Sequence, residues 1–146
     1  MYICSHLSAG YIAGKATRAS GYTMSLWLAG SLLPDIDGLW SSSVAGHHSF
    51  PHSPFFWLCL IILSFLLPKK SALKYGIFIV SISAFIHLFT DWFTARTTGI
   101  QLLYPWSLFD YSLFPINPDK GNIPIINMLG WEYFSFYLDN IFLFIF

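Results

Sequence analysis

Charged side chains are scarce in this chain of 146 residues. Asp, Glu, Lys and Arg together make up 10% of the sequence, whereas roughly 25% is usual in soluble domains. Seven basic residues balance seven acidic ones, so no basic field exists that would bind nucleic acid, and we expect no nucleic-acid partner. Hydrophobic residues reach 55% and aromatic residues 20%. This composition is typical of a membrane protein.

Cysteine is scarce too, and the sequence has no internal repeat and no low-complexity tract. The two cysteines, Cys4 and Cys59, lack Cys-x-x-Cys spacing, which excludes a zinc site built from a set of thiolates. The chain is long enough for one domain with a real core and too short for two. We therefore expect a single membrane-associated domain over residues 1–146.

Apolar stretches broken by prolines predict an all-α fold. We expect helices over residues 3–14, 20–33, 55–67 and 72–93. Pro34 ends the second helix, and Pro54 suits the first position of the third. Only the fourth has the roughly 20 residues that cross a bilayer. An irregular segment up to Pro124 and a last apolar helix complete a membrane-associated, up-and-down bundle of four to five helices.

His87 and Asp91 stand four residues apart near the end of the fourth predicted helix. Residues at this spacing share one face of a helix, so the imidazole and the carboxylate point together out of an apolar surface. Such a pair is typical either of a hydrogen-bonded couple in the core or of two metal ligands.

The other histidines decide between these two interpretations. In an antiparallel bundle the helix ends alternate between two faces, and all five histidines fall at the same end as an aspartate-rich turn. This end carries His6, Asp35, Asp37, His47, His48, His52, His87 and Asp91. Five of the seven basic residues fall at the opposite end, namely Lys15, Arg18, Lys69, Lys70 and Lys74. The segregation predicts a metal site, because divalent cations need imidazoles and carboxylates from several elements.

Imidazoles and carboxylates without thiolates favour one or two catalytic ions, with Zn²⁺ first and Mn²⁺ or Fe²⁺ as alternatives. Asp35 and Asp37 both stay open as ligands, because Asp35 can instead form an Asx-turn with its own backbone and leave Asp37 as the ligand. His47 and His48 are not separated either. Arg96 either clamps a substrate phosphate or lies at head-group level. The candidate ligands are His6, Asp35, Asp37, His47, His52, His87 and Asp91, and the candidates for catalysis are Asp37, His52 and Asp91.

These pieces resemble the YdjM-like family of membrane-bound, metal-dependent hydrolases. The matching pieces are His6-Leu7, Leu32 to Asp37, the loop Gly46 to Ser53, and His87 to Asp91 continuing through Thr94, Gly99, Leu102, Leu103 and Pro105. In the loop, His48, Ser49 and Pro51 replace the Arg, Gly and Thr of the family pattern. The ligand order is also similar to that of the all-helical zinc phospholipase C and nuclease fold. The resemblance implies a protein of the bacterial inner membrane that hydrolyses a phosphoester of a small molecule or a membrane lipid.

Two functions follow from these patterns. The first is a hydrolase that uses a metal-activated water, and the second is a non-catalytic membrane protein whose metal is structural or whose cluster docks a partner. A transporter would need polar residues along the whole length of its helices. Lysines near membrane helices stay in the cytoplasm, so we expect the candidate site at the outer face. The sequence specifies neither the substrate nor the oligomeric state.

Overall fold

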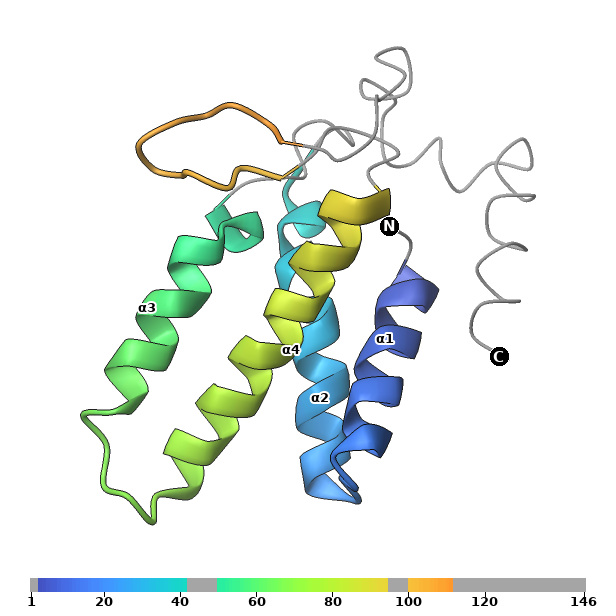
Figure 1. The fold of residues 1–146 in the computed structure, drawn as a ribbon, viewed down its shortest axis with the longest axis vertical. Helices are drawn as coiled ribbons and strands as arrows, with labels where there is room; N and C mark the ends of the chain where they lie inside the picture. Colours follow the sequence, from blue (N-terminus) through green and yellow to red (C-terminus); the bar gives the residue numbers. More distant parts are fainter. Residues whose placement is uncertain (1–2, 42–49, 95–99, 112–146) are drawn as a thin grey trace.

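A computed structural model describes residues 3–41, 50–94 and 100–111 of the chain (Figure 1). Within these ranges the fold is all-α, as predicted, and the only β pairing is an isolated bridge between Ile100 and Tyr111. The elements are four α-helices and two short 3₁₀-helices. They are α1 (Ile3–Ala16), α2 (Tyr22–Leu32), η1 (Leu33–Leu39), η3 (Phe50–His52), α3 (Pro54–Ser64) and α4 (Ala72–Thr94).

Two prolines set helix boundaries next to the candidate site. The α-helix α2 ends at Leu32, but the chain does not leave helical geometry as we expected from Pro34; it continues into η1. Pro34 fits there because it lies in the first turn of the new helix, where no backbone N–H is needed. Pro54 is the first residue of α3, as predicted. Ser53 precedes it in an extended conformation, and its hydroxyl donates to the carbonyl of Tyr104 instead of capping the helix.

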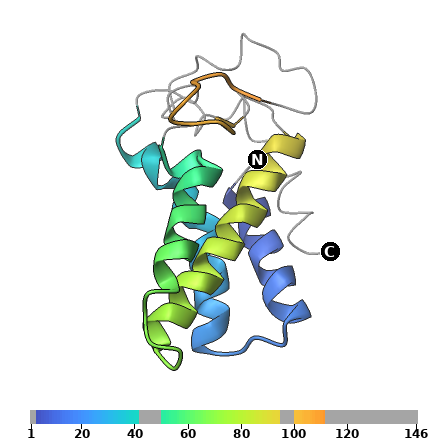
Figure 2. The same cartoon turned by 60° about the vertical axis from the view of Figure 1, so that its left-hand side comes forward.

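The four α-helices form an up-and-down bundle, which confirms that part of the prediction (Figures 1 and 2). α4 contacts α1, α2 and α3, so it is the central element. The views show α2 and α4 running in one direction and α1 and α3 in the other. The predicted final helix lies outside the described residues, and residues 100–111 form turns, as expected for the irregular segment.

Small and hydroxyl-bearing residues line the contact between α2 and α4. A Cβ atom placed on Gly30 would lie 2.7 Å from Cβ of Ser83 and would also overlap the carbonyl oxygen of Val80. At this close approach the Ser83 hydroxyl donates to the carbonyl of Trp27 across the helices at 2.5 Å. Packing through small residues and inter-helix hydrogen bonds is typical of membrane helices. The described apolar core is correspondingly small, centred on Trp57, Ala84, Leu88 and Ile100.

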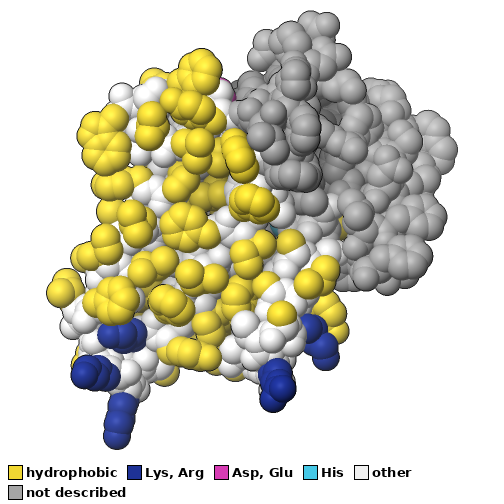
Figure 3. Space-filling model, viewed as in Figure 1, with side chains coloured by type: hydrophobic (Ala, Val, Ile, Leu, Met, Phe, Trp, Pro, Cys, Tyr) yellow, Lys and Arg dark blue, Asp and Glu magenta, His cyan; other side chains and the backbone are white. Residues whose placement is uncertain are grey.

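Apolar side chains face outward over most of the described bundle. Figure 3 shows them covering the helical face, with the Lys and Arg side chains gathered at one end. We call this the basic end; it carries Lys15, Arg18, Lys69, Lys70 and Lys74. The stretch Ala72–Trp92 of α4 is long and apolar enough to cross a membrane, and it is the one such helix in the described ranges.

Candidate metal centre

Four elements bring imidazoles and carboxylates together at the end of the bundle opposite the basic end. α1 supplies His6 near its start, and α4 supplies His87 and Asp91 near its end. Between them, η1 supplies Asp35, and η3 supplies His52. The predicted convergence on one end of the bundle is therefore present among the described residues. We call these five side chains, His6, Asp35, His52, His87 and Asp91, the His/Asp cluster.

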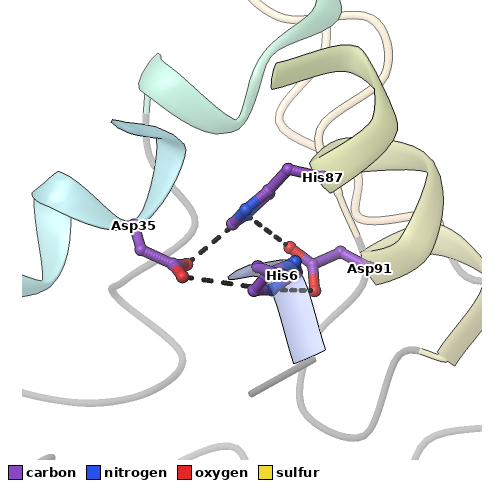
Figure 4. Close-up of side chains that lie close together, drawn as sticks. All are labelled: His6, Asp35, His87 and Asp91. Carbon is purple, nitrogen blue, oxygen red and sulfur yellow. Dashed lines mark ion pairs between the residues drawn. The ribbon is translucent and has the colours of Figure 1, made fainter. Parts of the chain in front are cut away.

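Four members of the cluster face one another directly (Figure 4). Nε2 of His87 lies 3.0 Å from Oδ2 of Asp91 and 3.4 Å from Oδ1 of Asp35. Nε2 of His6 lies 3.3 Å from Oδ1 of Asp91 and 3.9 Å from Oδ2 of Asp35. One donor atom from each of the four lies within 4.8 Å of all the others, an arrangement that could hold a metal ion.

His52 adds a fifth donor to this group. Its Nε2 lies 3.3 Å from Nε2 of His87 and 3.4 Å from Oδ1 of Asp35. The same nitrogen is 3.7 Å from Oδ2 of Asp91. All three imidazoles thus direct the same ring atom, Nε2, toward the two carboxylates.

The opposite ring nitrogen, Nδ1, has an acceptor in each imidazole. Nδ1 of His87 donates to the backbone carbonyl of Ser31 at 2.8 Å, and Nδ1 of His52 faces Oδ2 of Asp37 at 3.1 Å. Nδ1 of His6 lies 3.3 Å from the hydroxyl of Thr90, which gives its own proton to the carbonyl of His87. These partners assign the proton of each neutral ring to Nδ1, which leaves the lone pair on Nε2. Ring orientation of this kind is characteristic of metal-binding histidines.

The pKa values of two of these imidazoles are shifted in opposite directions. Burial, with the nearby His87 ring second, lowers the pKa of His6 to about 4. Burial also acts to lower the pKa of His52, but its hydrogen bonds with Asp35 and then Asp37 outweigh burial, so that its net pKa is raised above 6.5. His6 is therefore neutral near pH 7, while a proton on His52 would compete with a cation.

The structure places the predicted site residues in three groups. Of the two aspartates that the sequence did not separate, Asp35 is in the cluster and lies near Nε2 of His52. Asp37 lies outside the cluster, next to Nδ1 on the opposite side of the same ring. His47 and Arg96, like His48, lie outside the described residues. No sequence pattern singled out Ser31 or Thr90. The only available signal for Thr90 was a polar residue three positions after His87, and Ser31 acts through its backbone, which leaves no trace in the sequence.

Comparison with models of protein families identifies the family of the chain. The model described as "YdjM inner membrane protein" matches residues 1–145. The chain belongs to this family. Membership confirms the predicted resemblance to the YdjM family and places the chain in the inner membrane, in keeping with the apolar exterior and the length of α4. Neither the curated proteins nor the solved structures contain a match to it.

The spacing within the cluster suits a single ion. Zinc ligands bound at about 2.0–2.2 Å stand about 3.3–3.6 Å apart in a tetrahedral shell, and the nitrogen–oxygen pairs of the cluster range from 3.0 to 3.9 Å. Nε2 of His6 is buried and makes no hydrogen bond of good geometry within the described part of the chain. A buried lone pair of this kind is costly to leave unused. The donor set therefore fits a divalent cation.

Proposed function

We propose that this protein is a membrane-bound, metal-dependent hydrolase that cleaves a phosphoester with a metal-activated water. The observation that carries the proposal is the common orientation of the three imidazoles. Each presents Nε2 to the carboxylates of Asp35 and Asp91 while its Nδ1 is held by a separate acceptor. Three imidazoles held in this way before any ligand arrives are characteristic of a prearranged ligand shell.

His6, Asp35, His52, His87 and Asp91 would hold the ion. A bound divalent ion supplies Lewis acidity, because it polarises a phosphoryl oxygen and brings the pKa of bound water toward neutrality. The imidazole and carboxylate donors of the cluster suit Zn²⁺, and Mn²⁺ and Fe²⁺ are the alternatives. A pair of ions about 3.5–4 Å apart would need a wider set of donors than this one, so we propose one ion.

The side chains around the ion have separate tasks. Asp37 holds the ring of His52 through Nδ1 at 3.1 Å, which fixes the direction of Nε2 and increases the basicity of the ring. Asp91 lies between His6 and His87, 3.3 and 3.0 Å from their Nε2 atoms, and so links the two helices. The side chain of Asp35 is 13% exposed, whereas those of Asp91 and the three histidines are at most 2% exposed. Water and substrate therefore have their access beside Asp35.

A structural metal site is the second candidate, and the burial of four of the five donors favours it. A closed ion would stabilise the junction of α1, η1, η3 and α4 without taking part in any reaction. Both candidate functions require a bound metal ion, but only the hydrolase converts a substrate.

Metal analysis and turnover on one preparation test both. We expect about one ion per chain in protein purified in detergent, and metal-dependent hydrolysis of a soluble phosphodiester such as bis(p-nitrophenyl) phosphate. His87→Ala and Asp91→Ala should lose both properties, whereas Asp110→Asn, a change of an aspartate outside the cluster, should lose neither. Protein without bound metal would contradict both candidates. A retained ion without any turnover would leave the structural site as the answer.

A further inference from the structure

The depth of the His/Asp cluster along α4 indicates where in the bilayer it lies. Lys69 and Lys70 are exposed just before α4 begins at Ala72, and lysines at this position lie at head-group level. At about 1.5 Å per residue, His87 is about 22 Å and Asp91 about 28 Å along the helix from Ala72. Because the hydrocarbon layer is about 30 Å thick, the cluster lies near the opposite boundary. This is the depth at which acyl chains give way to the phosphate groups of lipids.

The open edge of the cluster is bordered by apolar side chains. Asp35, the most exposed member, lies on η1, and the other outward-facing residues of that element and its end are Ile36, Leu39 and Trp40. Leu39 is 83% exposed and Trp40 is 64% exposed. Contiguous exposed apolar side chains of this kind mark a surface that contacts a membrane or an apolar ligand.

This border is continuous with the outward face of α3. On η3, Phe50 stacks at an angle on Phe56 of α3, with ring centroids 4.3 Å apart, and η3 contacts η1. Farther along, the rings of Phe55 and Trp106 are in contact, with centroids 4.7 Å apart. The exposed side of α3 then continues toward the basic end through Leu58, Ile62 and Leu63. Acyl chains that cover α3 in the bilayer would therefore extend to the edge of the metal site.

We propose that the substrate is a phospholipid of the leaflet opposite the basic end, bound with its phosphate beside Asp35 and its acyl chains along η1 and α3. This rests on the proposed hydrolase function. In the reaction the oxygen of one water bonds to phosphorus and one phosphoester P–O bond breaks. The leaving alkoxide receives a proton from that water, so the products are an alcohol and a phosphate monoester. An anionic phosphate also complements the cation that the cluster would hold.

Competing substrates test this assignment. Metal-loaded protein is reconstituted in vesicles of phosphatidylethanolamine and phosphatidylglycerol, and lipid cleavage is compared with cleavage of bis(p-nitrophenyl) phosphate. We expect a higher kcat/KM for the lipid. Leu39→Ser and Trp40→Ser should lower the ratio of lipid to soluble turnover by about tenfold each, since an apolar contact with the chains is lost. Leu66→Ser, an equally exposed apolar position near the basic end, should leave the ratio unchanged.

The outcomes separate this inference from the function on which it rests. Turnover of the soluble diester with no preference for the lipid, and with a ratio that Leu39→Ser does not alter, would overturn the lipid assignment and leave the hydrolase in place. Absence of turnover on both substrates in metal-loaded protein would overturn both. The metal content of each variant, measured in parallel, shows that a lowered ratio comes from the border and not from a disrupted site.

Discussion

The imidazole rings of His6 and His87 are stacked, with centroids 3.6 Å apart and ring planes 17° from parallel. The contact joins α1 to α4. Two protonated rings in this arrangement would repel each other, and the nearby His87 ring is one of the causes, after burial, that lower the pKa of His6 to about 4. Stacking therefore holds the Nε2 atoms of the two rings side by side, each near an oxygen of Asp91.

The first prediction separates the packing role of His6 from its donor role. His6→Phe keeps an aromatic ring against His87 but removes Nε2, so we expect a melting temperature close to that of the parent chain without metal. Removing a residue that hydrogen-bonds to a metal ligand lowers the metal affinity by about 10- to 100-fold. Removing the ligand itself should lower it by more than about 100-fold. Titration against a competing chelator measures the affinity. Unchanged affinity in His6→Phe would remove His6 from the ligand set.

The second prediction concerns pH. Because the carboxylates of Asp35 and Asp37 raise the pKa of His52, a proton occupies Nε2 below that pKa, and metal binding should weaken as the pH falls through it and tighten as the pH rises. His6 adds no such competition near neutral pH. Asp37→Asn removes one of these carboxylates, so the midpoint of the pH dependence should move to lower pH, while the affinity at pH 8 falls by about 10- to 100-fold. A midpoint that stays in place would contradict this role of Asp37.

Thr90 supplies the third prediction. Its hydroxyl lies 3.3 Å from Nδ1 of His6 and donates to the carbonyl of His87 at 2.7 Å. Thr90→Val keeps the shape and removes both interactions, so the affinity for metal should fall by about tenfold or more. Thr90→Ser restores the hydroxyl and should restore the affinity. If valine and serine behave alike, the threonine has only a packing role.

Gly30 provides the fourth prediction, on the packing between α2 and α4. In Gly30→Ala the new Cβ meets Ser83 and the carbonyl of Val80, and overpacking of this kind lowers the free energy of unfolding by about 1–3 kcal/mol. Gly76→Ala is the control within α4, because its nearest neighbour is a Leu26 methyl group at 3.9 Å. Helix propensity alone should make that variant more stable by about 0.5–1 kcal/mol. Thermal unfolding in detergent measures both, and equal effects of the two substitutions would contradict the close approach.

The fifth prediction concerns orientation in the membrane. The basic end should face the cytoplasm, which places the His/Asp cluster at the outer face. In chains whose native Cys4 and Cys59 are replaced by alanine, Asp110→Cys, at an exposed position in the segment that contacts the start of α3, should react with an impermeant maleimide in intact spheroplasts. Lys70→Cys should react only after lysis. The reverse pattern would show that the orientation is inverted.

Several helix boundaries could be predicted from the sequence because prolines and apolar length act locally, although α3 ends at Ser64, before the predicted end at residue 67. The start of α3 at Pro54 and the extent of α4 followed from the residues alone. The shared face of His87 and Asp91 followed from helical spacing, and the structure places their donor atoms 3.0 Å apart.

The choice between Asp35 and Asp37 did not follow, because it depends on how tightly the chain turns after α2. An Asx-turn at Asp35 would have left Asp37 as the carboxylate that reaches the imidazoles. In the 3₁₀-helix η1, which has about three residues per turn, residues two apart point in different directions. Asp35 therefore reaches Nε2 of His52, and Asp37 reaches Nδ1 of the same ring. The partners of Nδ1 in His87 and His6 come from other helices. Periodicity along a single helix does not reveal such contacts.

One pair of contacts between α2 and α4 has a consequence for the connections of the chain. The Ser83 hydroxyl bonds to the carbonyl of Trp27, and one turn farther along both helices Nδ1 of His87 bonds to the carbonyl of Ser31. Because α2 continues directly into η1, these two bonds fix the height of Asp35 relative to His87. The spacing of these donors is thus independent of loop length. Insertions or deletions in the turn between α3 and α4 should be tolerated without any change in the ligand shell.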